Sequence, residues 1–394
     1  MRKLICDLYV YDDGHHIAYV NSIMTWAADR EDLIFLFNKD AATFCPCLAG
    51  DERVHFVDED FLAKNRENVL RGKWREYQYI RQFAIRQAIE KVIFLEIDQY
   101  QLAIGLIPSP FRITGIIFRS FHKIRVMADS LPATLKNAIY RAKKRLMFRV
   151  FRLNRKVEPL FLLNDRAGCT RYPDYFTYLP DPVFPHQPKT GRPSGPDPGG
   201  SRSSLSSSPD VRSFYRIPAT THIFLVSGAM GGRKNIRHIV DAYQQASLDH
   251  LSVLLIAGKV RADYRVEFDA AINSYTSQDP RKRMIVVDEF IDDDRLDAWF
   301  RDSDTIVLCY RKFYGSSGLM GKAAEHGKTC IVPDQGLLFD LCRQYSLGYT
   351  ADPEDIESIA AALSLAQKSP QVSAGHNRFV QDHSEHAFLA TLLP

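Results

Sequence analysis

The sequence predicts an α/β protein with two domains, each built around a parallel β-sheet. Short apolar runs of strand length alternate with longer segments whose apolar residues recur at helical spacing. This alternation occurs in both halves of the chain, and 394 residues suffice for two domains that each have a core. A segment rich in Pro, Gly and Ser lies between the halves and is too polar to bury a core.

These features set the expected domain boundaries. We expect an N-terminal domain at 1–185, a flexible linker or insertion at 186–213 and a C-terminal domain at 214–370. Residues 371–394 would then form a tail that could cross back to the N-terminal domain.

Composition narrows the class of protein. Hydrophobic residues at 45% and charged residues at 25% are typical of a soluble globular protein, and a net charge of +4 is too small to indicate nucleic-acid binding. The 7 cysteines are scattered and form neither a disulfide framework nor a zinc motif, which predicts a cytoplasmic location. The N-terminal stretch meets Asp7 too early for a signal peptide, and no apolar run is long enough for a membrane span.

In the N-terminal half, the first predicted strand at 4–11 is followed by a turn that contains Gly14 and two histidines. Gly14 could pass close to a ligand, whereas adjacent histidines do not face one site and are interpreted as loop residues rather than metal ligands. Glu96 and Asp98 follow the predicted strand at 91–95. They could reach a cleft at the strand ends or pair locally.

The C-terminal half contains a glycine-rich turn between a predicted strand at 222–227 and a helix at 236–246. The turn includes Gly228, Gly232, Arg233 and Lys234, so glycines that permit close backbone approach precede cations at a helix start. The next strand ends at Gly258.

A second turn of this kind follows the predicted strand at 305–310, which ends in Tyr310. Ser316, Ser317 and Gly318 open a helix there, and the unpaired amides and dipole of a helix N-terminus favour an anion. The alternative is that one serine only caps the helix. Because ligands of an open parallel sheet bind beyond the carboxyl ends of its strands, we predict a diphosphate between the two turns.

The order of these pieces resembles the donor domain of GT-B glycosyltransferases of the retaining family 4. The resemblance covers roughly residues 175–365 and includes the segments LPDPV at 179–183, SGAMGGRKNI at 227–236 and IAG at 256–258. It implies two Rossmann-like domains facing a central cleft and transfer of a sugar from a nucleotide-diphosphate donor. The implied acceptor is a glycan or a lipid-linked molecule in surface polysaccharide or glycoconjugate assembly. The resemblance also implies retention at the anomeric carbon, with no metal and no cofactor besides the donor.

The resemblance also implies roles for individual residues. Arg233 and Lys234 would neutralise the leaving diphosphate, and His122 would meet the donor sugar. The expected donor-binding residues are Gly14, Gly228, Gly232, Gly258, Tyr310, Ser316, Ser317, Gly318, Lys322 and Glu325.

The sequence departs from the family at two positions. The family carries two glutamates around the second turn, and counting back from Gly327 places Tyr314 and Lys322 there. Two other functions therefore stay open. One is a non-catalytic subunit that binds a nucleotide sugar or a partner, and the other is a sugar-nucleotide epimerase that uses Glu96 or Asp98 for proton chemistry.

Residues 133–157 contain many basic and no acidic side chains, and apolar residues recur among them at helical spacing. A basic amphipathic helix is typical of proteins that bind an anionic membrane surface, here on its cytoplasmic side. The alternative is a charged surface helix whose apolar stripe packs onto the domain.

Overall fold

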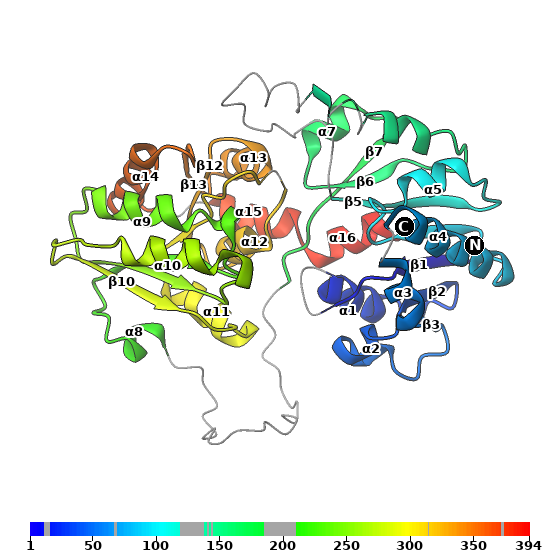
Figure 1. Cartoon of the computed structure of the whole chain (residues 1–394), viewed down its shortest axis with the longest axis horizontal. Helices are drawn as coiled ribbons and strands as arrows, with labels where there is room; N and C mark the ends of the chain where they lie inside the picture. Colours follow the sequence, from blue (N-terminus) through cyan, green and yellow to red (C-terminus); the bar gives the residue numbers. More distant parts are fainter. Residues whose placement is uncertain are drawn as a thin grey trace. The chain divides into compact units, whose positions relative to one another are not determined.

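The computed structural model describes residues 1–11, 16–66, 69–118, 138–139, 142, 145–184, 210–313, 315–371 and 374–394. The chain divides into two compact units, shown in Figure 1. Unit 1 comprises Met1–Asp181 with Glu385–Pro394, and unit 2 comprises Pro182–Ser384. Gly14, His122, Tyr314 and linker residues 185–209 lie outside the described residues.

Unit 1 contains a sheet of 7 parallel strands in the order β3-β2-β1-β4-β5-β6-β7. The strands are β1 (Lys3–Asp7), β2 (Leu33–Asn38), β3 (Val54–Val57), β4 (Lys91–Phe94), β5 (Arg112–Ile117), β6 (Leu160–Leu163) and β7 (Phe176–Leu179). Every residue of β2 is buried, as expected for a central parallel strand that helices cover on both faces.

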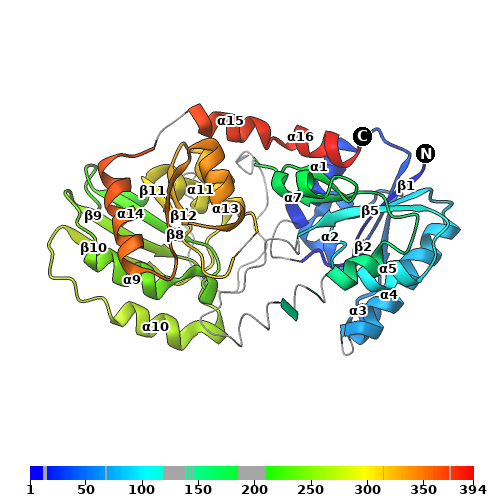
Figure 2. The ribbon, with the colours of Figure 1, turned by 90° about the horizontal axis from the view of Figure 1, so that it is seen from above.

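The connections of unit 1 are mostly helical, as Figure 2 shows. The helices are α1 (His16–Trp26), α2 (Ala41–Phe44), η1 (Pro46–Leu48), α3 (Glu59–Arg66), α4 (Val69–Arg86), α5 (Gln101–Leu106), α7 (Arg166–Arg171) and α16 (Glu385–Leu392). Residues 145–151 are helical as well.

Unit 2 contains a sheet of 6 parallel strands in the order β10-β9-β8-β11-β12-β13. The strands are β8 (His222–Ser227), β9 (Ser252–Ala257), β10 (Lys282–Val287), β11 (Thr305–Val307), β12 (Thr329–Pro333) and β13 (Gly348–Ala351). The helices are α8 (Val211–Phe214), η2 (Gly232–Lys234), α9 (Ile236–Gln245), η3 (Ala262–Tyr264), α10 (Arg265–Asn273), α11 (Asp293–Asp302), α12 (Gly318–Glu325), α13 (Gly336–Tyr345), α14 (Ile356–Lys368) and α15 (Ala374–Asp382).

The core of unit 2 has two layers, one on each face of the sheet. Because side chains alternate along a strand, Phe224 and Val226 of β8 pack with α9, α10 and α14, while Ile223 and Leu225 pack with α11, α12 and α13. The two layers enclose the sheet. Their packing holds the ends of its strands in place.

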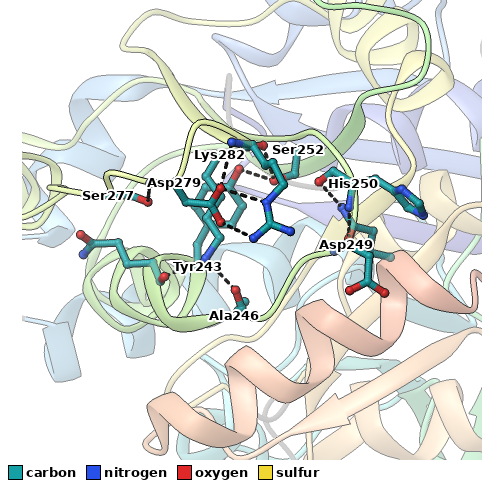
Figure 3. Close-up of polar contacts among 11 residues, drawn as sticks. Tyr243, Ala246, Asp249, His250, Ser252, Ser277, Asp279 and Lys282 are labelled. Atoms are coloured by element: carbon teal, nitrogen blue, oxygen red, sulfur yellow. Dashed lines mark hydrogen bonds and ion pairs between the residues drawn. The ribbon is translucent and has the colours of Figure 1, made fainter.

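Polar contacts secure the end of α9 at the amino edge of this sheet (Figure 3). Lys282 Nζ donates to the carbonyl oxygens of Gln244 at 2.7 Å and Ala246 at 2.6 Å, and Tyr243 Oη lies 2.8 Å from Ser252 Oγ. A cation at the last carbonyls of a helix satisfies their hydrogen-bonding capacity and complements the helix dipole.

Both sheets have the same winding. In each unit the chain begins at a central strand, adds strands to one side and then crosses to the other side. The crossover creates a switch point at the carboxyl edge, between β1 and β4 in unit 1 and between β8 and β11 in unit 2. This topology confirms the predicted fold class of two Rossmann-like domains.

Candidate functional site

At the carboxyl edge of unit 2, beside the switch point between β8 and β11, the turns after β8 and β9 touch. Gly228 has φ 95° and Gly258 has φ 148°, in the region that favours glycine. A Cβ atom on Gly258 would lie 2.0 Å from the carbonyl oxygen of Gly228, so only glycine fits at this contact. The glycines expected from the sequence therefore bring two backbone segments together.

Lys234 lies at the centre of this switch point, at the end of η2. Its side chain is only 2% exposed. The Nζ atom donates to the carbonyl oxygen of Ser227 at 2.5 Å and to Tyr310 Oη at 3.1 Å, and it lies 4.6 Å from the centre of the Tyr310 ring. Among the described residues, no carboxylate forms an ion pair with Lys234. A buried ammonium that has only neutral partners favours the approach of an anion.

Arg233 extends from the same turn but stays exposed. Its guanidinium carbon lies 5.1 Å from the centre of the Phe313 ring and 5.8 Å from that of Tyr310. The Arg233 carbonyl oxygen accepts a 2.9 Å hydrogen bond from the backbone N–H of Arg311, which joins this turn to the segment after β11. Phe313 was not predicted, although it follows the predicted strand that ends at Tyr310.

The second predicted turn lies beside the first. Ser317 is the N-cap residue of α12, but its side chain makes no capping hydrogen bond, so capping does not account for this serine. A Cβ atom on Gly228 would lie 3.7 Å from Leu319 Cδ1 in the first turn of α12 and 3.2 Å from Lys234 Nζ. The structure thus brings Gly228, Lys234 and the N-terminus of α12 together.

A cavity of about 450 Å³ opens beside the glycine turn. It is lined by Ala229, Gly231, Gly232, Arg233, Arg261, Asp263, Tyr264 and Glu267. Arg261 and Asp263 form an ion pair at 3.0 Å, and this contact with Arg261 lowers the pKa of the Asp263 carboxyl. Sequence reasoning missed the last four lining residues, although they follow Gly258 directly along the chain.

Lys322 and Glu325 extend from α12 toward α11. Lys322 Nζ lies 3.0 Å and His326 Nε2 lies 2.9 Å from Oδ1 of Asp297. Burial acts to raise the pKa of Asp297, but the hydrogen bonds from His326 and Lys322 outweigh it and hold that pKa below its ordinary value. A contribution of Lys322 or Glu325 to donor binding stays a prediction.

The group around Asp297 is also the place to consider for a metal ion. Asp297, Glu325 and His326 offer ligand atoms within 4.8 Å of one another. The Lys322 ammonium already supplies a positive charge to the Asp297 carboxylate, so the arrangement is that of an ion-pair network rather than an open metal site.

The two carboxylates predicted near the edge of the unit 1 sheet form local contacts. Glu96 Oε2 accepts from the side chain of Gln99 at 2.9 Å, and Asp98 Oδ2 accepts from the backbone N–H of Phe118 at 2.7 Å. The sequence left open whether these carboxylates reach a cleft or pair locally, and the structure shows local pairing.

No protein-family model and no curated protein matches this sequence. Solved structures match it over nearly the whole chain at low identity. Sucrose-phosphate synthase from Thermosynechococcus elongatus is 13% identical, with a TM-score of 0.66 over 99% of this chain and 97% of its own. WaaG, a glycosyltransferase involved in lipopolysaccharide biosynthesis, is 14% identical, with a TM-score of 0.60 over 99% and 97%. Anabaena HepE, solved in complex with UDP and glucose, is 12% identical, with a TM-score of 0.61 over 98% and 97%. This chain therefore shares the GT-B fold with these proteins.

Proposed function

We propose that the protein is a glycosyltransferase that takes a sugar from a nucleotide-diphosphate donor bound at the switch point of unit 2. One observation carries the proposal. The Lys234 ammonium is buried between a glycine turn and a helix N-terminus with no carboxylate partner among the described residues. A diphosphate supplies the negative charge that this arrangement favours.

The same arrangement suits the chemistry of transfer. Negative charge develops on the diphosphate as the bond to the sugar breaks, and fixed cations and dipoles at that point stabilise the transition state more than the ground state. Lys234, Arg233 and the amides at Gly318 would serve this purpose without a metal ion. The cavity beside Gly232 would hold the nucleoside, since carboxylates such as Asp263 can accept hydrogen bonds from ribose hydroxyls. The complex of HepE with UDP and glucose supports a donor of this class.

We further propose that unit 1 binds a glycan or lipid-linked acceptor and contacts an anionic membrane surface. The helical residues 145–151 bury Phe148 and Phe151 but leave Leu146 62% exposed. Ile139 lies one heptad before Leu146 and Leu153 one heptad after it, and these two side chains are 59% and 66% exposed. Arg145 and Arg149 are exposed as well. Apolar side chains among exposed cations fit a negatively charged lipid surface. No helix in the described part of the chain is long and apolar enough to cross a membrane.

A panel of nucleotide sugars tests the function directly. The purified protein is incubated with UDP-, GDP-, ADP- and dTDP-linked sugars, and the products are identified by NMR and mass spectrometry. We expect release of the nucleoside diphosphate by slow hydrolysis, or by transfer when an acceptor is present. Isomerised donor would instead indicate an epimerase.

A non-catalytic subunit is the second candidate, and Lys322 is the observation that favours it. The family resemblance places a glutamate at this position, whereas the lysine pairs with Asp297. Binding of a nucleotide sugar without any turnover in the panel would support that function. The local contacts of Glu96 and Asp98 give no support to an epimerase.

A further inference from the structure

The cavity beside the glycine turn lies between two segments of unit 2 that are joined by backbone hydrogen bonds. The Met230 N–H donates to the Lys259 carbonyl oxygen at 2.9 Å, and the Arg261 N–H donates to the Met230 carbonyl oxygen at 3.0 Å. A Cβ atom on Gly231 would lie 3.1 Å from Cδ of Arg261. The segment that follows β9 is therefore held against the turn that carries Lys234, so the cavity keeps a fixed place beside the proposed diphosphate site.

The segment after β9 contributes one guanidinium and two carboxylates to the cavity. Arg261 pairs with Asp263 through two parallel hydrogen bonds, from Nε to Oδ1 and from Nη2 to Oδ2, each 3.0 Å long. Nη1 of Arg261, which carries two N–H groups, takes no part in this pair. Glu267, in the first turn of α10, is exposed and forms no ion pair or side-chain hydrogen bond with any residue that the structure describes. Donors of Arg261 and acceptors of Glu267 are thus both open to a ligand.

Tyr264 supplies the aromatic surface of the cavity. The residue is 7% exposed, and its ring packs edge-on against Phe268, with ring centres 6.4 Å apart. A Cβ atom on Gly232 would lie 4.0 Å from Cδ2 and Cε2 of this ring, so the missing side chain of Gly232 leaves that side of the ring uncovered. A volume of about 450 Å³ lies within the usual range of small-molecule sites. The cavity therefore suits a planar base that contacts an aromatic ring and hydrogen-bonds at its edge.

The hydrogen-bonding edge of each base decides which one fits these side chains. Guanine alone among the common bases presents two adjacent donors, N1–H and the N2 amino group, and a carboxylate can accept from both. It also presents the acceptors O6 and N7, which a guanidinium binds. Uracil has one N–H between two carbonyl oxygens, and adenine has an amino group beside a ring nitrogen that accepts. A carboxylate that faces either of these bases meets an acceptor as well as a donor.

We propose that the donor is a guanosine-diphosphate sugar and that Glu267 and Arg261 select its base. Glu267 accepts from N1–H and the N2 amino group, and Nη1 of Arg261 donates to O6 and N7. Asp263 holds the Arg261 guanidinium in place and stays beside the ribose. The proposal rests on the proposed donor site at Lys234 and names the class of nucleotide that this site takes.

The first measurement is calorimetric titration of GDP, IDP, UDP and ADP into the unmodified full-length protein. A bidentate base contact should make GDP bind about 5- to 150-fold more tightly than UDP and ADP. IDP keeps O6, N7 and N1–H but lacks the N2 amino group, so its affinity should lie between. If UDP or ADP binds as tightly as GDP, the guanine assignment is overturned while the donor site at Lys234 stands. If none of these nucleotides binds, the proposed function itself fails, and the choice of base with it.

The second measurement repeats the titrations with variants. Glu267→Gln keeps the size of the side chain but replaces one acceptor by a donor, so it should weaken GDP more than IDP and bring the two affinities close together. Arg261→Gln should weaken GDP and IDP by similar factors, because both bases carry O6 and N7. Glu357→Gln neutralises another exposed first-turn glutamate, on α14 outside the cavity, and is the control with unchanged affinities. A Glu267→Gln variant that keeps the GDP-to-IDP preference of the unmodified protein would refute the role of Glu267.

Discussion

At the carboxyl edge of unit 2, Gly258 occupies a position that has no room for even one added carbon atom. It lies at the contact between two turns, with φ 148°, and an added Cβ would meet the Gly228 carbonyl oxygen at 2.0 Å. Gly327 also has a positive φ, 64°, but an added Cβ there would meet nothing within 4 Å. A comparison of substitutions at these two glycines therefore distinguishes the cost of backbone strain from the cost of a steric clash.

We expect Gly258→Ala to lower the free energy of unfolding by about 3 kcal/mol or more, because it adds a clash to the strain. Gly327→Ala adds only the strain of the left-handed backbone conformation, so it should lower the free energy of unfolding by about 1 kcal/mol. Urea denaturation of both variants measures the difference. Equal losses would mean that the two turns separate easily and do not form a rigid site.

The residues of the proposed donor site differ in how far the sequence predicts them. Gly228, Lys234 and Gly258 are predictable because each follows a recognisable apolar strand within a few residues. The cavity residues Arg261 and Tyr264 were missed because they belong to a short turn without a periodic pattern.

At the scale of elements, the strands were predicted well because the buried parallel strands are continuous apolar runs. The ends of elements were predicted less well. The first strand was expected at 4–11 and ends at Asp7, after which the side chains of Asp7 and Asn38 accept hydrogen bonds from the backbone N–H groups of Tyr9 and Val10 in place of the ladder. The strand expected at 305–310 ends at Val307, since Tyr310 turns toward Lys234. In both cases side-chain hydrogen bonds take over where the predicted strand was too long.

We expect His222, the first residue of β8, to make the stability of the protein depend on pH. Burial lowers the pKa of His222 from 6.5 to about 4, and the nearby Asp304 carboxylate opposes this shift only in part. Below pH 6.5 the unfolded chain takes up a proton on His222, whereas the folded protein does not until about pH 4. The free energy of unfolding should therefore fall as the pH falls through this range, by up to about 3 kcal/mol from this residue.

Urea denaturation at pH 7 and pH 5 tests this contribution. His222→Gln can still face Thr305, the residue that His222 Nε2 contacts at 2.9 Å, but it cannot titrate. We expect the variant to lose less stability between the two pH values than the unmodified protein. The same loss in both proteins would show that His222 is not responsible.

At the scale of the whole molecule, both units share one topology but present different chemistry at their switch points. Unit 2 places the buried Lys234 ammonium there, and unit 1 places the buried Asp7 carboxylate beside the His16 imidazole. The buried cation of unit 2 suits the leaving diphosphate of the proposed reaction. The exposed apolar and basic residues of unit 1 add a surface through which it could meet a lipid-linked acceptor.

Vesicle co-sedimentation tests that surface. The protein should bind vesicles that contain anionic phosphatidylserine or phosphatidylglycerol, and binding should weaken as salt shortens the Debye length. Each cation near such a surface contributes about 1 kcal/mol, so Arg145→Glu with Arg149→Glu should weaken binding by roughly tenfold or more. Arg71→Glu with Arg75→Glu reverses two exposed arginines at the same spacing on α4 and is the matched control. Absence of binding at low salt would leave a soluble acceptor as the better proposal.

The most direct test of the donor site is calorimetric titration of UDP, GDP and ADP into the unmodified protein and three variants. Lys234→Met keeps the aliphatic stem but removes the ammonium, Arg233→Gln removes the exposed cation, and Lys368→Met removes a lysine near the opposite edge of the sheet. One nucleoside diphosphate should bind the unmodified protein. Loss of a charge-assisted contact worth about 1.5–3 kcal/mol should weaken its binding roughly 10- to 150-fold in Lys234→Met, with a smaller loss in Arg233→Gln and none in Lys368→Met. Unchanged affinity in a Lys234→Met variant that melts at the temperature of the unmodified protein would contradict the proposed site.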